Sequence, residues 1–181
     1  FASELPRPTL FYGSSSNNEG KVFYTSGADT IVKKLAPNKL VNTLTLSEGN
    51  LKSIKVNFKQ ADSIPIYGFN FDDGKGVHVD NFSNRGNSGL PIGSFDVATM
   101  RAFHSKLDYD LIVLQYGANV LNYGSLNYGW YEKRMANVVA HLKECFPGVA
   151  ILIVSTADKS TKYDLEMKTD SAVVPLNTAQ K

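Results

Sequence analysis

The sequence is poor in the residues that form disulfides and bind metal ions. Among its 181 residues there is one cysteine, Cys145, and there are three histidines, His78, His104 and His141. A single cysteine cannot form an internal disulfide, and these four residues show none of the short spacings that zinc sites use. We therefore expect neither a disulfide framework nor a structural metal.

The net charge of the chain is also small, and its apolar runs are short. Nineteen basic residues face 17 acidic ones, the net charge is +2, and neither sign forms a long block. This balance does not favour binding to nucleic acid or to an anionic membrane surface. No apolar run approaches the roughly 20 residues that span a bilayer, and no signal peptide is recognisable, so no transmembrane segment is expected.

The two ends of the sequence suggest a piece of a longer protein. The chain begins at Phe1 without an initiator Met, and residues 171–181 resemble the first turns of a helix that stops abruptly. We interpret the sequence as an internal fragment.

The first part of the chain has the pattern of a β domain. In residues 51–59, Ile54, Val56 and Phe58 alternate with polar side chains, which is typical of a half-buried strand. Six short runs rich in β-branched and aromatic residues are separated by turn-forming residues; they span residues 9–13, 21–25, 30–35, 39–46, 51–58 and 64–71. Short strands at this spacing predict a β-sandwich or jelly-roll module over residues 1–73.

The second part, residues 74–181, alternates predicted strands and helices. Apolar strands are expected at 76–82, 109–116 and 149–156, with a short helix over 94–107 that Ser94 or Asp96 caps. A longer helix ends at Pro147–Gly148, and its apolar positions follow helical spacing: Met135, Val138, Val139, Leu142 and Phe146. This alternation predicts a partial parallel α/β sheet.

Polar loops that contain glycine or small polar residues follow the three predicted strands of this sheet. They cover residues 83–89, 117–119 and 156–160, and the ends of parallel strands gather at one edge, where such sheets bind ligands. A glycine N–H and an asparagine amide, here Gly89 and Asn119, form a suitable donor pair for an oxyanion. The alternative is that both are ordinary turn residues.

The stretches "NRGNSG" (residues 84–89) and "GAN" (residues 117–119) resemble the second and third blocks of the SGNH (GDSL-like) hydrolases. The resemblance implies a flavodoxin-like fold, a Ser–Asp–His triad that deacylates esters, and no cofactor. Gly89 would be the backbone oxyanion donor and Asn119 the side-chain donor. Val120 stands where that family has Asp. The preceding β module resembles the carbohydrate-binding-like domain of cell-envelope members that look like peptidoglycan or polysaccharide O-acetylesterases.

The remaining catalytic blocks of that family are missing from this sequence. No Gly-Asp-Ser block carries a nucleophile, and no Asp-x-x-His block carries the acid and base. The resemblance then leaves a gap for one strand between residues 76–82 and 109–116, so the missing part of the same protein is an expected partner. A peptidoglycan or other carbohydrate substrate would place the protein in the periplasm or outside the cell.

Four further residues are candidates for substrate binding. Tyr123, Tyr128 and Trp130 alternate with Asn and Gly beyond Asn119, a composition that suits stacking on sugars; the alternative is that these aromatic rings pack the start of the next helix. Arg85 would either meet an anionic substrate group or brace its loop. Two other functions stay open. One is a non-catalytic glycan-binding module. The other, a nucleotide- or flavin-binding domain, is less favoured because the sequence has no phosphate-binding loop before a helix.

Overall fold

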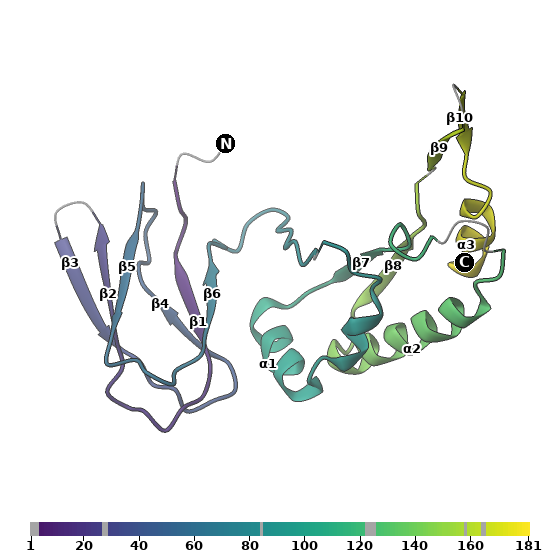
Figure 1. Cartoon of the computed structure of the whole chain (residues 1–181). Coiled ribbons are helices and arrows are strands. Elements are labelled where there is room, and N and C mark those ends of the chain that lie inside the picture. Colours follow the sequence, from purple (N-terminus) through teal and green to yellow (C-terminus); the bar gives the residue numbers. More distant parts are fainter. Residues whose placement is uncertain (1–3, 27–28, 84, 122–125, 158, 164–165) are drawn as a thin grey trace. The chain divides into compact units, whose positions relative to one another are not determined.

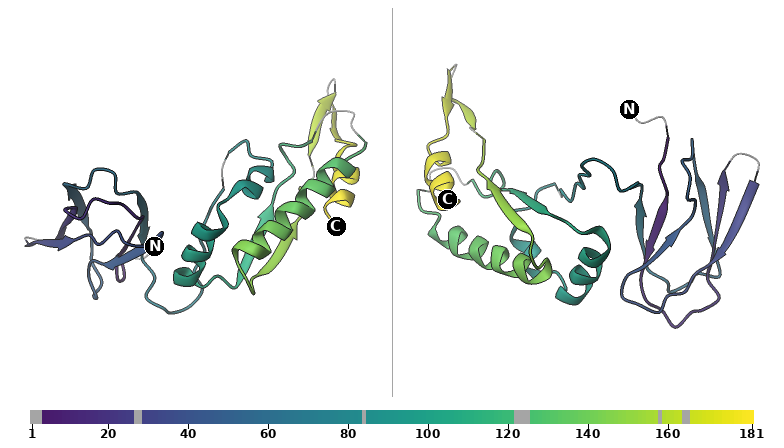
Figure 2. Two further views of the ribbon diagram at one scale, coloured as in Figure 1. Left: turned by 90° about the horizontal axis from the view of Figure 1, so that it is seen from below. Right: turned by 180° about the vertical axis from the view of Figure 1, so that it is seen from behind.

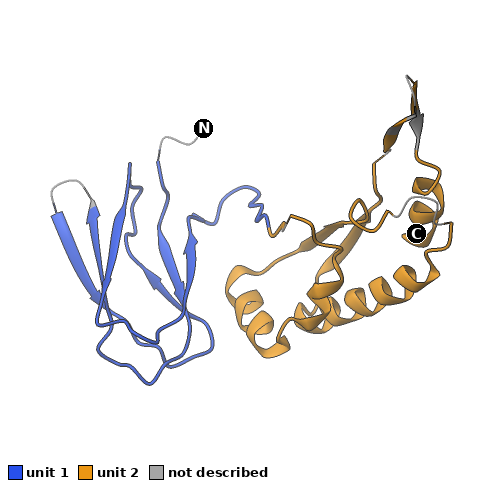
Figure 3. Cartoon of the chain, in the orientation of Figure 1, with its two compact units in different colours: residues 1–81 blue, residues 82–181 orange. Residues whose placement is uncertain are grey.

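The computed structural model describes residues 4–26, 29–83, 85–121, 126–157, 159–163 and 166–181. It divides into two compact units, Phe1–Asn81 and Phe82–Lys181 (Figure 3). The division falls eight residues after the predicted boundary between 73 and 74, because the irregular segment that follows the last strand of the first unit is grouped with that unit.

The first unit consists of two antiparallel sheets of three strands (Figure 1). One sheet has the order β4–β1–β6, and the other has the order β3–β2–β5. The strands are β1 (Thr9–Tyr12), β2 (Lys21–Ser26), β3 (Asp29–Lys34), β4 (Asn42–Thr45), β5 (Lys55–Lys59) and β6 (Ile66–Asn70). Each lies within or overlaps one of the six predicted runs, so the six predicted strands are confirmed, and the assignment to a β-sandwich or jelly roll stays a prediction.

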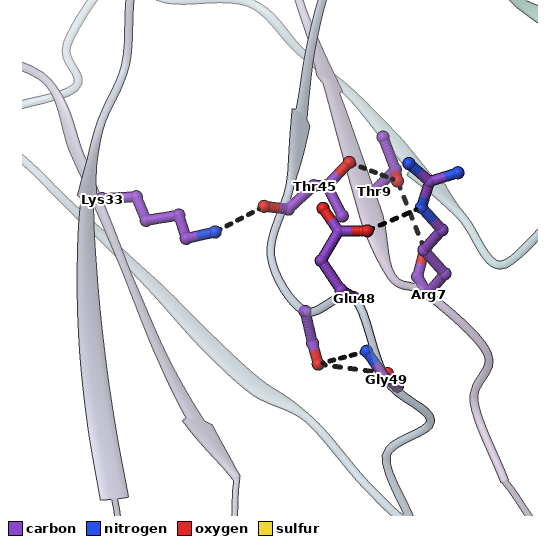
Figure 4. A network of polar contacts seen from close by, with 7 residues as sticks. Arg7, Thr9, Lys33, Thr45, Glu48 and Gly49 are labelled. Atoms are coloured by element: carbon purple, nitrogen blue, oxygen red, sulfur yellow. Dashed lines mark hydrogen bonds and ion pairs between the residues drawn. The ribbon is translucent and has the colours of Figure 1, made fainter.

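One apolar cluster joins the two sheets of the first unit. It contains residues from both, among them Leu10 and Tyr12 of β1 and Val22 and Tyr24 of β2. Polar contacts also cross between the sheets: Lys33 Nζ donates to the main-chain oxygen of Thr45 at 2.6 Å (Figure 4), and the buried Tyr24 hydroxyl donates to the main-chain oxygen of Leu46. These bonds add polar contacts between the two sheets, at the part-buried oxygen of Thr45 and the buried oxygen of Leu46.

The second unit is built around two parallel strands and three helices. Its elements are the 3₁₀ helix η1 (Leu90–Ser94), α1 (Val97–Leu107), β7 (Leu111–Gln115), α2 (Gly129–Cys145), β8 (Ala150–Val154), the hairpin β9 (Ser160–Tyr163) and β10 (Glu166–Thr169), and α3 (Val173–Ala179). Strands β7 and β8 pair in parallel, with Leu111 beside Ala150 and Val113 beside Leu152. The β9–β10 hairpin lay outside the sequence prediction.

Local sequence explains where the helices of this unit begin and end. Of the two predicted caps of α1, Asp96 is the one used: its carboxylate accepts from the N–H and the hydroxyl of Thr99 at 2.8 and 2.7 Å. These bonds also lower the pKa of Asp96. Helix α2 ends just before Pro147–Gly148, as predicted, and Gly148 has a φ of 88°.

Helices α1 and α2 cover one face of the strand pair (Figure 2). Leu114 of β7 lies in the core with the buried stripe of α2, which consists of Tyr131, Met135, Val138, Leu142 and Cys145. The opposite face is open in the described residues: Leu111, Val113 and Leu152 keep 50%, 52% and 49% of their surface exposed. The partial parallel sheet is therefore covered on one side, where such sheets are ordinarily covered on both.

The predicted strand over residues 76–82 is wrong. These residues form no strand, and Val77 and Val79 are 92% and 85% exposed. Alternating apolar residues favour a strand only when a neighbouring strand completes the ladder and covers the apolar face. The structure describes no such neighbour for this segment.

Candidate functional site

The candidate site lies within the second unit, where β7 and β8 end. Tyr116 and Gly117 follow β7, Thr156 follows β8, and residues 85–89 lead into η1. Hydrogen bonds and side-chain contacts join all three segments, so the predicted convergence of three loops is observed for their described residues.

Gly117 occupies a position where any side chain would be strained and crowded. Its φ is 126°, and a Cβ atom there would lie 2.0 Å from Thr156 Oγ1 and 3.1 Å from Gln180 Nε2. Both of these groups donate to the main-chain oxygen of Tyr116, Thr156 Oγ1 at 3.2 Å and Gln180 Nε2 at 2.7 Å. Glycine therefore allows the loop after β7 to be tied to the loop after β8 and to the end of α3.

A single turn after Gly117 carries Asn119 to the surface. The N–H groups of Val120 and Leu121 donate to the Gly117 main-chain oxygen at 2.7 and 3.1 Å. The side chain of Asn119 is exposed, and its Nδ2 donates to the main-chain oxygen of Asn87 at 3.0 Å. This bond crosses from the loop after β7 to the loop before η1.

Gly89 is also fixed by close approach. It is buried, its φ is 85°, and a Cβ atom there would lie 2.8 Å from the Tyr116 ring. Its N–H donates to Asn87 Oδ1 at 2.7 Å. The two donors that the sequence singled out, Gly89 N–H and Asn119 Nδ2, therefore both bind oxygens of Asn87.

Tyr131 holds the loop of residues 85–89 through a hydrogen bond. It lies in the first turn of α2, is fully buried, and its hydroxyl donates to the main-chain oxygen of Ser88 at 2.8 Å. Burial, with a smaller contribution from Tyr116, raises the pKa of Tyr131 to about 12. The hydroxyl therefore stays protonated and able to donate at any ordinary pH.

The residues predicted to bind substrate have different environments. Arg85 is exposed in a turn beside the loop, and Tyr123 lies outside the described residues. Tyr128 is 3% exposed and belongs to the core cluster, so the packing alternative holds for it and its prediction as a sugar platform is corrected. The Tyr128 ring packs with apolar residues of α2 and β7. These contacts come from distant parts of the chain, so the composition of the loop does not reveal them.

Trp130 remains open to solvent. It is 47% exposed, its ring lies edge-on to Tyr131, and the Arg134 guanidinium lies 5.5 Å from the ring centre. Together with Asn127, Gly129 and Lys133 it lines a shallow hollow. Such a surface has an aromatic ring and polar groups within reach of one small ligand.

Sequence reasoning did not identify several groups that hold the site together. Thr156, Tyr131 and Gln180 donate to main-chain oxygens, and such bonds leave no residue pattern to recognise. Asn87 accepts from the Gly89 N–H through its Oδ1 and from Asn119 Nδ2 through its own main-chain oxygen. The first unit also contains a cluster of possible metal ligands, Asp72, Asp73 and His78, whose ligand atoms lie within 4.8 Å of one another. The expectation from sequence had considered only His and Cys spacings, and this cluster is mostly exposed.

In the described residues, no helix is long and apolar enough to cross a membrane. No known protein family and no curated protein matches the sequence. Among solved structures, a peptidoglycan O-acetylesterase is similar, with a TM-score of 0.56 and 17% identity, over 99% of this chain and 49% of that chain. The chain thus spans about half the length of that esterase, and at this identity the likeness concerns the fold. Nearly all of this chain shares the fold of part of a peptidoglycan O-acetylesterase.

Proposed function

We propose that this chain is part of an SGNH-type serine ester hydrolase that deacylates O-acetylated carbohydrate of the cell envelope. The nucleophile and the Asp and His of the triad would lie in the rest of the parent protein, and this chain would supply oxyanion donors. The observation that carries the proposal is that Gly89 N–H and Asn119 Nδ2 both donate to Asn87, the first to its Oδ1 and the second to its main-chain oxygen. The fold likeness to a peptidoglycan O-acetylesterase supports the same substrate class.

The chemistry assigns each group a role. The serine oxygen attacks the acetyl carbonyl, its proton passes to the histidine, and the carbonyl oxygen becomes an oxyanion. The oxyanion replaces Asn87 Oδ1 as the acceptor of the Gly89 N–H and takes a second bond from Asn119 Nδ2. The bond from the acetyl carbon to the sugar oxygen then breaks, and this oxygen takes the proton from the histidine to become the free hydroxyl. Water then hydrolyses the acetyl-serine ester, which releases acetate and returns the proton to the serine oxygen.

Neutral donors suit this role because they stabilise developing charge without holding a counter-ion. Preorganised N–H groups are most effective where the surrounding structure fixes them before the reaction. Here Gly89 is held by its close approach to Tyr116, and Asn119 by the turn that begins at the constrained Gly117. The site would therefore need little reorganisation beyond release of Asn87.

The test is Asn119→Ala in the parent protein, assayed on an aryl acetate and on O-acetylated peptidoglycan. Loss of one oxyanion donor is expected to lower kcat by about 10²–10³-fold while KM changes little. Asn50→Ala is the matched control, because it removes an exposed amide that donates to Glu4 in the first unit. A parent protein that releases no acetate, or an Asn119→Ala variant with unchanged kcat, would contradict the proposal.

A non-catalytic glycan-binding module is the second candidate, and the exposed Trp130 ring in its polar hollow favours it. The two candidates differ in what the parent protein must contain. A Gly-Asp-Ser block before this segment and an Asp-x-x-His block after it would support the hydrolase, and the lack of both would support the binding module.

A further inference from the structure

The Tyr131 hydroxyl and the Gly89 N–H act on the same peptide unit. Tyr131 donates to the main-chain oxygen of Ser88, and the peptide bond that carries this oxygen also carries the nitrogen of Gly89. In a planar trans peptide the C=O and the N–H point in opposite directions. No cis peptide occurs in the described residues. Fixing the Ser88 oxygen therefore fixes the direction of the Gly89 N–H.

This restraint points the Gly89 N–H away from the core. The Ser88 oxygen turns inward, to a tyrosine that is fully buried in the core with α2. The Gly89 N–H turns away from that hydroxyl and meets Asn87 Oδ1 at 2.7 Å. The same residue, Asn87, accepts from Asn119 Nδ2 at 3.0 Å.

Glycine makes such a restraint necessary. Gly89 has a φ of 85°, in a region where glycine moves freely between conformations. A rotation of the Ser88–Gly89 peptide plane would turn the N–H toward the core and remove it from the loop surface. The Tyr131 bond opposes this rotation, because the rotated plane would leave a buried hydroxyl without its acceptor.

We propose that Tyr131 is a positioning residue that aims the Gly89 N–H at the oxyanion. This inference rests on the proposed function, since it assigns the Tyr131–Ser88 bond a role in that reaction. Burial raises the pKa of Tyr131 to about 12, so the hydroxyl keeps the proton that it donates to the Ser88 oxygen.

The first test is Tyr131→Phe in the parent protein, with Tyr24→Phe as the matched control. Tyr24 is also buried and also donates its hydroxyl to a main-chain oxygen, that of Leu46, in the first unit. Both variants keep the ring that fills the core, so similar, small losses of thermal stability are expected. Only Tyr131→Phe should lower kcat on an aryl acetate, by at least about tenfold, with KM nearly unchanged.

The second test needs no catalysis. In the ¹H–¹⁵N spectrum of the 181-residue chain, Tyr131→Phe should shift or broaden the Gly89 amide signal, and Tyr24→Phe should leave it in place. An unchanged Gly89 signal overturns the claim that the Tyr131–Ser88 bond fixes the Gly89 N–H. An active parent enzyme whose kcat is the same in both variants overturns its catalytic role. A parent protein that is inert on acetyl esters overturns the proposed function. The Gly89 signal still shows whether the Tyr131–Ser88 bond fixes the Gly89 N–H.

Discussion

At the scale of single residues, two glycines determine how closely the loops of the candidate site approach. Gly89 lies against the Tyr116 ring, and Gly117 lies against Thr156 and Gln180. Both combine a left-handed φ with a neighbour inside the space of a Cβ atom. Their conformation and their surroundings therefore each require glycine.

Gly117→Ala tests this requirement. Strain at a φ of 126° and overlap with Thr156 Oγ1 at 2.0 Å are expected to lower the free energy of unfolding by about 2–4 kcal/mol, measured by urea denaturation. Gly93→Ala is the control, since its Cβ atom would lie 3.6 Å from Val138, an ordinary contact. Equal midpoints for the two variants would show that the loop relaxes without cost.

The sequence alone indicates Gly89 and Asn119 as candidate oxyanion donors, because both belong to short motifs after predicted strands. It did not predict the role of Tyr131, since a bond to a main-chain oxygen can be made by many residue types at many positions. Nor did it predict that Asn87 accepts from both Gly89 N–H and Asn119 Nδ2. It misjudged Tyr128 because aromatic residues in a Gly- and Asn-rich loop look equally suited to solvent and to a core. Burial of that ring depends on helix α2, which periodicity predicts without its exact packing.

At the scale of elements, periodicity was the reliable guide wherever a neighbouring element covered the apolar face. The alternation in β5 and the stripe of α2 from Met135 to Leu142 both appear in the structure. Residues 76–82 have a similar alternation and form no strand. A strand depends on a partner strand that can lie far away in the sequence, so its own pattern is insufficient.

The open face of the β7–β8 pair gives a prediction at this scale. Val113 is 52% exposed, whereas the next residue, Leu114, is 3% exposed in the core. Val113→Lys should change the free energy of unfolding by at most about 1 kcal/mol, because the new charge stays in water. Leu114→Lys should cost more than about 4 kcal/mol, because the charge would be buried without a partner.

Urea denaturation followed by far-UV circular dichroism of the 181-residue chain separates these variants. A large loss of stability for Val113→Lys would mean that this face is covered in solution. The test therefore reports directly on which side of the sheet the core lies.

At the scale of the whole molecule, the chain contains two separate apolar cores. One lies between the sheets of the first unit, and the other lies between β7, β8 and the helices of the second. The two clusters share no residue. Each unit therefore has its own source of stability.

This separation predicts two independent unfolding transitions. The single tryptophan, Trp130, belongs to the second unit, so its fluorescence reports on that unit. Leu10→Ala should lower the stability of the first unit by about 2–5 kcal/mol and leave the fluorescence midpoint unchanged. Leu142→Ala should lower the fluorescence midpoint by a comparable free energy. A fluorescence midpoint that moves with Leu10→Ala would mean that the units unfold together.

The open sheet face also affects how the chain behaves in concentrated solution. Leu111, Val113 and Leu152 form a water-facing apolar strip. Sulfate and phosphate are excluded from protein surfaces and strengthen the tendency of apolar groups to leave water. As these salts are added, the strip will draw molecules together. The sedimentation coefficient, corrected for solvent density and viscosity, will therefore rise more in sulfate than in chloride of the same ionic strength, where charge screening is equal.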